Sequence, residues 1–130
     1  MSATVVTFGE TMALVRGSDI GSFPHTSSLA LGIGGAESNV AVGLQRLGVT
    51  VSWLGRVGDD SLGTRVTREI RAEGVDVRAV VDDGAATGLM LKERPSASST
   101  VVHYYRAGSA GSRLGPADLP AGWVEDAALL

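Results

Sequence analysis

The chain has 130 residues, 44% of them hydrophobic, and this length and composition predict one folded domain rather than a disordered chain. Its 11 basic and 14 acidic residues give a net charge of −3, which does not suggest the basic surface that a nucleic-acid-binding protein needs. The lack of cysteine excludes disulfides and thiolate metal sites and favours a cytoplasmic protein. No run approaches the ~20 apolar residues of a membrane helix, so we expect neither a nucleic-acid partner nor a membrane partner.

The first quarter of the chain predicts one buried strand followed by a hairpin. Residues 4–8 are rich in β-branched side chains and stop at Gly9, which is typical of a short buried strand. Residues 11–15 and 28–33 predict two further strands, with loop chemistry at 16–21 between them. We expect this hairpin to stand off the main sheet.

The middle of the chain alternates strands with amphipathic helices. The first expected elements are a helix over about 37–47, a strand over 49–54 that ends at Gly55, and a loop over 56–60. A second helix follows, with Leu62, Val66 and Ile70 on one stripe, and it ends at Gly74. The last expected element here is a strand over 75–81. Together with the first strand, this order is the pattern of a parallel sheet with crossover helices. The sequence therefore predicts an α/β fold.

The last third of the chain departs from this pattern. Residues 87–93 and 100–106 predict a second hairpin, joined through 95–99, and the Gly/Ser/Pro-rich stretch 107–119 predicts a loop. Residues 123–130 pass from acidic to apolar, as at the start of another buried strand. Because a three-stranded parallel core leaves an open sheet edge, we expect the chain to be truncated there.

The glycine-rich stretch before the first helix is the first candidate site. Gly32, Gly34 and Gly35 allow a close backbone approach, and the helix that follows presents unpaired N–H groups to an oxygen-rich small molecule. Asn39, one turn into this helix, can donate to and accept from a ligand hydroxyl. A tight turn that feeds an ordinary helix remains an equal alternative. The dinucleotide fingerprint is incomplete, because Glu37 takes its third glycine position.

The second candidate site lies on the strand at 103–106. Strand alternation places His103 and Tyr105 on one face and Tyr104 and Arg106 on the other. A phenol beside a forked cation suits a sugar acid, because the phenol binds a hydroxyl and the fork binds a carboxylate. An ordinary exposed face with a packed tyrosine is the alternative.

The remaining titratable residues predict no catalytic or metal site. Asp59 and Asp60 precede the second helix, and N-capping is favoured over a catalytic pair of acids. Neither His25 nor His103 has a second histidine nearby in the sequence, so no metal ligand is assigned.

Several motifs, in order along the chain, resemble those of one enzyme family. Residues 34–41 (GGAESNVA) with 44–48 (LQRLG) resemble the first signature of the ribokinase-like sugar kinases of the phosphofructokinase B type. Residues 8–10, 54–63 and 73–75 resemble further junctions of that family. Within it, the pieces 34–37 and 104–110 are most similar to the kinases of 2-keto-3-deoxygluconate.

The resemblance implies a ribokinase-like fold, with an incomplete Rossmann-like core and a small β-strand lid. The implied core covers about 1–10, 34–82 and 107–130, and the implied lid about 11–33 and 86–106. By resemblance, Gly34, Gly35 and Asn39 bind substrate hydroxyls, and Tyr104 and Arg106 reach the substrate from the lid. A homodimer formed through the lid is also implied.

The implied activity of the full-length protein is transfer of the γ-phosphoryl group of ATP, with Mg²⁺, to 2-keto-3-deoxygluconate or a similar sugar acid. This chain has Leu14 where many members carry an acid, and Met90 where the keto-acid kinases commonly have tyrosine. The family's Gly-Ala-Gly-Asp motif, which carries the catalytic base, is absent, so we expect these 130 residues alone to be inactive. The alternatives are a kinase for another sugar, such as fructose or ribose, and a non-catalytic sugar-binding or dimerisation module.

Overall fold

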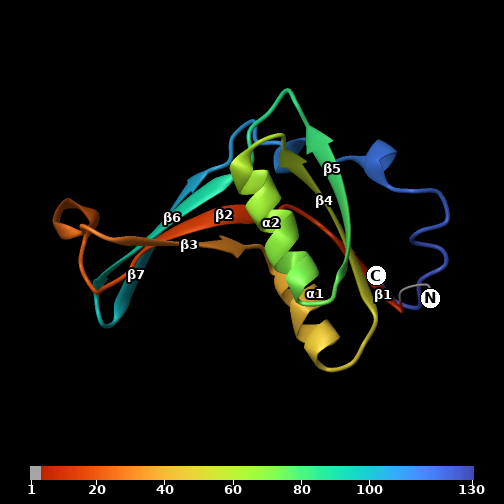
Figure 1. The fold of residues 1–130 in the computed structure, drawn as a ribbon, viewed down its shortest axis with the longest axis horizontal. Helices are drawn as coiled ribbons and strands as arrows, with labels where there is room; N and C mark the ends of the chain where they lie inside the picture. The colour runs from red at the N-terminus through yellow and green to blue at the C-terminus, as the bar shows by residue number, and fades with distance from the viewer. Residues whose placement is uncertain (1–3) are drawn as a thin grey trace.

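The computed structural model describes residues 4–130, which form a parallel sheet, a mixed sheet and two α-helices (Figure 1). The parallel sheet has the order β1-β4-β5 and contains β1 (Val5–Phe8), β4 (Val51–Gly58) and β5 (Asp76–Asp82). The mixed sheet has the order β3-β2-β6-β7 and contains β2 (Met12–Gly17), β3 (Leu29–Gly34), β6 (Leu89–Ser96) and β7 (Ser99–Tyr105). The predicted α/β class, the parallel sheet and both hairpins are confirmed.

The crossover helices α1 (Ala36–Arg46) and α2 (Ser61–Ala72) share one apolar core with the parallel sheet. Ala41 of α1 and Val66 and Ile70 of α2 pack in the same cluster as Trp53 of β4, and all four side chains are fully buried. Each helix is followed by a glycine with φ +88°, Gly48 after α1 and Gly74 after α2, a conformation that favours glycine. The predicted helix ends are therefore confirmed to within one or two residues.

Strand β4 is longer than the sequence predicts, and the expected end at Gly55 is wrong. The strand continues through Gly55 to Gly58, and the expected loop 56–60 shrinks to the two aspartates before α2. A Cβ atom at residue 55 would lie 2.2 Å from Cζ2 of Trp53 and 3.0 Å from the carbonyl oxygen of Gly9. This glycine therefore makes room for the buried indole and does not end the strand.

The mixed sheet joins two hairpins that are far apart in the sequence. β2 and β3 are antiparallel, as are β6 and β7, and a parallel pairing of β2 with β6 unites them. The second hairpin is tighter than predicted, because Ser96 and Ser99 are paired across its turn. In Figure 1 this sheet extends away from both helices, with the short helix η1 (Phe23–His25) at its far end.

The predicted loop after the second hairpin contains two short 3₁₀ helices, η2 (Gly111–Arg113) and η3 (Pro116–Asp118). Near the carboxyl end, Leu129 makes one isolated parallel bridge to Val5 of β1. The amide of Val6 donates to the carbonyl of Leu129 at 3.0 Å. Neither helix of the described chain, residues 4–130, has the length and apolar character needed to cross a membrane.

Candidate functional site

All five predicted binding residues line one cavity of about 600 Å³, which we call the inner cavity. It lies between the amino end of α1 and one face of the mixed sheet. The residues that the structure brings together here are Gly34, Gly35, Asn39, Tyr104 and Arg106. The two candidate sites of the sequence are thus two walls of the same cavity.

The glycine wall is open because the start of α1 has no side-chain cap. Gly34 ends β3, and Gly35 is the N-cap residue in an extended conformation, with no side chain to accept from the first-turn N–H groups. Such an uncapped helix start attracts ligand oxygens. Asn39 lies one turn into α1 and is one of the residues that line the cavity.

Gly35 is also packed tightly against the residues behind it. A Cβ atom there would lie 2.7 Å from Oγ1 of Thr11 and 2.8 Å from the carbonyl oxygen of Glu10. Thr11 is itself fixed, because its buried hydroxyl donates to Oγ of Ser38 at 2.8 Å. A Cβ atom at Gly34 would instead meet only the side chain of Met90, whose terminal methyl can swing aside.

The strand wall confirms the predicted alternation of β7. Tyr104 and Arg106 line the inner cavity, and Tyr104 is 58% exposed. His103 lies on the opposite face, where its Nε2 is 2.7 Å from Oε2 of Glu93 and its ring lies near Phe23. This hydrogen bond from His103 is the main cause that lowers the pKa of the Glu93 carboxyl.

Glu10 is a cavity residue that the sequence reasoning missed. Its carboxylate is 5% exposed, its Oε1 lies 2.8 Å from Nη2 of Arg106, and its Oε2 accepts from the hydroxyl of Ser109. Gly88 and Gly111 leave the space that this side chain fills, because a Cβ atom on either would lie within 2.6 Å of it. Its place in the sequence could have identified it, because Glu10 follows the carboxyl end of a predicted parallel strand, where α/β sheets bind ligands.

Further residues of the mixed sheet line the same cavity, among them Leu14, Met90 and Lys92. Leu14 and Met90, the two positions where the sequence departs from the family pattern, are both in its wall. Lys92, also missed, follows Met90 by two residues and so shares its face of β6. Among residues 4–130, Lys92 forms no salt bridge, whereas Arg106 is paired with Glu10.

Asp60 is confirmed as the N-cap residue of α2, and it also ties the mixed sheet to the core. Its Oδ1 accepts from the amide of Gly63 and from the hydroxyl of Thr87, both at 2.7 Å, and its Oδ2 accepts from the amide of Thr87 at 3.0 Å. Burial by itself raises the pKa of this carboxyl, but these hydrogen bonds outweigh it and hold the pKa below its ordinary value.

A second ionic group, at the carboxyl ends of β4 and β5, was not predicted. Asp82, 4% exposed, accepts from Nε of Arg56 at 2.9 Å and from the amide of Gly84 at 2.8 Å, and these bonds lower its pKa. Arg56 also binds Asp118 at 2.7 Å, while Arg113 lies 3.3 Å from Asp82. The group holds η2 and η3 against the parallel sheet.

Comparison with known proteins identifies what this arrangement resembles. The sequence model of the pfkB family of carbohydrate kinases matches residues 2–130. A curated relative, the 2-dehydro-3-deoxygluconokinase of Bacillus subtilis, is 43% identical over 122 residues. That alignment covers 92% of this chain but only 38% of the relative, so the chain spans about two fifths of that protein's length.

Two of the solved structures that share the fold illustrate the likeness. The PfkB protein from Polaromonas sp. has a TM-score of 0.90 at 38% identity, covering 97% of this chain and 43% of its own. A sugar kinase from Pyrococcus horikoshii, solved in complex with ATP, has a TM-score of 0.85 at 28% identity, covering 94% of this chain and 40% of its own. The predicted ribokinase-like α/β fold is confirmed by this likeness.

Proposed function

Since the chain belongs to the pfkB family of carbohydrate kinases, we propose that its inner cavity binds the sugar substrate of an ATP-dependent kinase. The proposed substrate of the full-length protein is 2-keto-3-deoxygluconate or a similar sugar acid. One observation carries this proposal: an uncapped helix start and two cations, Arg106 and Lys92, line a single cavity. The name of the Bacillus relative, 2-dehydro-3-deoxygluconokinase, denotes a kinase of the same acid and supports it.

The two walls of the inner cavity bind different groups of such a substrate. The first-turn N–H groups of α1 and the amide of Asn39 bind hydroxyls, and the phenol of Tyr104 binds another oxygen from the opposite side. Arg106 binds the carboxylate through N–H groups that do not face Glu10, while Lys92 supplies a positive charge without a carboxylate partner among residues 4–130. The mixed sheet then serves as the lid of the site.

ATP and Mg²⁺ complete the proposed reaction by supplying the phosphoryl group and neutralising its charge. Residues 4–130 contain no group of three His, Cys, Asp or Glu side chains that could hold a metal ion. Because the chain spans only about two fifths of the length of its Bacillus relative, phosphoryl transfer is assigned to the full-length protein. A cytoplasmic location is part of the proposal, because an ATP-dependent kinase works where ATP is supplied and the sequence contains no cysteine.

The substrate class is tested by the variant Arg106→Ala. Binding of 2-keto-3-deoxygluconate to the ¹⁵N-labelled chain should weaken about 10- to 100-fold, because a charge-assisted hydrogen bond is lost and Glu10 is left facing the acid. Binding of a neutral sugar such as fructose should change by less than about threefold. The measurement is an NMR titration that follows the amides of Gly34, Gly35 and Asn39.

The matched control is Arg78→Ala, which removes an exposed arginine that pairs with Asp76 on β5, outside the inner cavity. It should leave both affinities unchanged. Equal losses with acid and neutral sugar in Arg106→Ala would remove the keto-acid assignment. If the acid shifted none of the three amides in the unmodified chain, the cavity would not be its binding site.

We also propose that two chains pair through the other face of the mixed sheet. Strand register places Leu31, Val15, Leu91 and His103 in one row across this face, opposite the side chains that line the inner cavity. Leu29 is 55% exposed and Leu31 is 41% exposed on β3, which is an edge strand. An exposed apolar sheet face of this kind favours association with a second copy.

The variant Leu31→Lys should convert the chain from dimer to monomer, because it places a charge on the apolar face at its exposed edge strand, β3. Sedimentation velocity measures the change. Val40→Lys is the matched control, since Val40 is 53% exposed on α1 and lies away from this face. A monomeric unmodified chain, or equal dissociation by both variants, would contradict the proposed dimer.

A further inference from the structure

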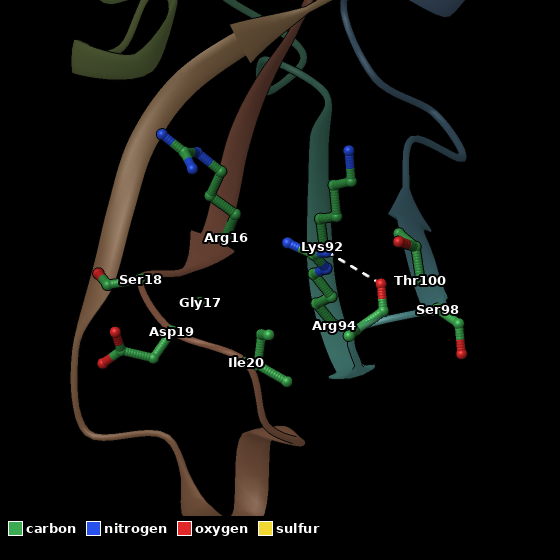
Figure 2. A pocket seen from close by; sticks show the side chains of 10 residues that line it. Arg16, Gly17, Ser18, Asp19, Ile20, Lys92, Arg94, Ser98 and Thr100 are labelled. Atoms are coloured by element: carbon green, nitrogen blue, oxygen red, sulfur yellow. Dashed lines mark hydrogen bonds between the residues drawn. The ribbon is translucent and has the colours of Figure 1, made fainter.

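A second cavity, of about 690 Å³, lies on the same face of the mixed sheet as the inner cavity but farther from α1 (Figure 2). We call it the outer cavity. Its charged wall is formed by Arg16 on β2 and by Lys92 and Arg94 on β6. Figure 2 shows Arg16 on one side of the hollow and the two β6 cations on the other.

These three cations line one cavity, and none of them has a carboxylate partner among residues 4–130. Across residues 4–130, none of them forms a salt bridge, whereas Arg46, Arg56, Arg65, Arg78, Arg106 and Arg113 all do. One carboxylate, that of Asp19, lines the outer cavity, and it pairs with none of the three. The outer cavity therefore concentrates uncompensated positive charge in a chain whose net charge is −3.

The backbone brings these like charges together at a cost. Arg16 and Lys92 are register partners in the parallel β2–β6 pairing, and Lys92 and Arg94 are two residues apart on one strand, so all three share a face. Like charges opposite one another on paired strands destabilise a sheet. An anion bound among them would offset this repulsion.

The other groups in the cavity suit an oxyanion. Ser18, Ser98 and Thr100 line it, and the hydroxyl of Thr100 can donate to a phosphate oxygen. The hydroxyls of Ser18 and Ser98 lie 3.3 Å from Oγ of Ser28 and 3.4 Å from Oγ of Ser96, respectively. Arg94 is held in place, because its Nη2 donates to the carbonyl of Ala97 at 2.9 Å. The volume lies within the range of about 300–1,000 Å³ that is typical of small-molecule sites.

We propose that the outer cavity is a second binding site, for a small phosphate-bearing anion. Arginine forks and hydroxyl donors match the geometry of phosphate oxygens better than that of a neutral sugar. The outer cavity is separate from the inner cavity, although Lys92 lines both. For that reason the test leaves Lys92 in place.

The test is a titration of the ¹⁵N-labelled chain with pyrophosphate, at an ionic strength held constant with sodium chloride. The amides of Gly17, Ser18 and Ser98 should shift and saturate together. The double variant Arg16→Gln/Arg94→Gln should weaken this binding by about tenfold or more. Arg94→Lys, which keeps the charge but loses the fork, should give an intermediate affinity and serves as the second variant.

The matched control is Arg68→Gln/Arg71→Gln on α2, which makes the same change in net charge at two arginines that also lack salt bridges among residues 4–130. This variant should bind pyrophosphate as the unmodified chain does. Equal weakening in both double variants would show general charge attraction and overturn the proposal. Unsaturable shifts, or no shift at the three amides, would overturn it as well.

Discussion

Gly35→Ala should destabilise the chain by about 1–3 kcal/mol and weaken sugar-acid binding by at least about tenfold. The added methyl group would lie within 2.8 Å of both Oγ1 of Thr11 and the carbonyl oxygen of Glu10, and neither can swing aside. Relief requires a shift of the start of α1, which carries the N–H groups proposed to bind the substrate. Urea denaturation measures the stability, and the NMR titration measures the affinity.

Two other glycines provide the controls for this prediction. Gly34→Ala meets only the flexible side chain of Met90, so its loss of stability should be well below that of Gly35→Ala. Gly43→Ala lies inside α1 with no atom within 4 Å of the added methyl, and should stabilise the chain by about 0.5–1 kcal/mol. If all three variants changed stability alike, the tight packing of Gly35 would not be the cause.

Asp60→Ala should lower the free energy of unfolding by about 2–4 kcal/mol. It removes the N-cap of α2 and leaves the amide and hydroxyl of Thr87 without their acceptor. This loss is costly because Thr87 is only 6% exposed, so water cannot replace the carboxylate. Because Thr87 lies two residues before the start of β6, the mixed sheet should also become more mobile relative to the core. Urea denaturation and hydrogen exchange at β6 measure the two effects.

The control is Asp59→Ala, since Asp59 is an exposed neighbour of the same charge, and its effect should stay within about 0.5 kcal/mol. The pKa of Asp60 is lowered by folding, so its contribution to stability is present above the ordinary value of 3.8 and is lost as the pH falls through the folded-state pKa. Asp60→Ala should therefore show a smaller loss of stability than the unmodified chain when both are acidified below pH 3.8. A parallel acid dependence in the two proteins would show that the Asp60 carboxylate is not responsible.

Local sequence signals predicted the elements well, and their one clear failure is instructive. Apolar periodicity predicts α1 and α2, and alternation predicts that Tyr104 of β7 and Arg106, just after β7, lie on one face, where both line the inner cavity. The sequence predicts that the strand ends at Gly55, because glycine commonly interrupts strands. Its actual role depends on the indole of Trp53, and no local pattern shows where a buried side chain will pack.

The sequence by itself determined the fold class, the order of its strands and helices, and the five residues proposed to bind substrate, because these follow from backbone preference, periodicity and short motifs. The tertiary structure alone decided that these residues share one cavity and that Glu10 is paired there with Arg106 and Ser109. Glu10 and Ser109 are 99 positions apart in the chain. Contacts across such distances depend on how sheets and helices pack, and charges such as Arg16 and Lys92 meet only when distant strands pair.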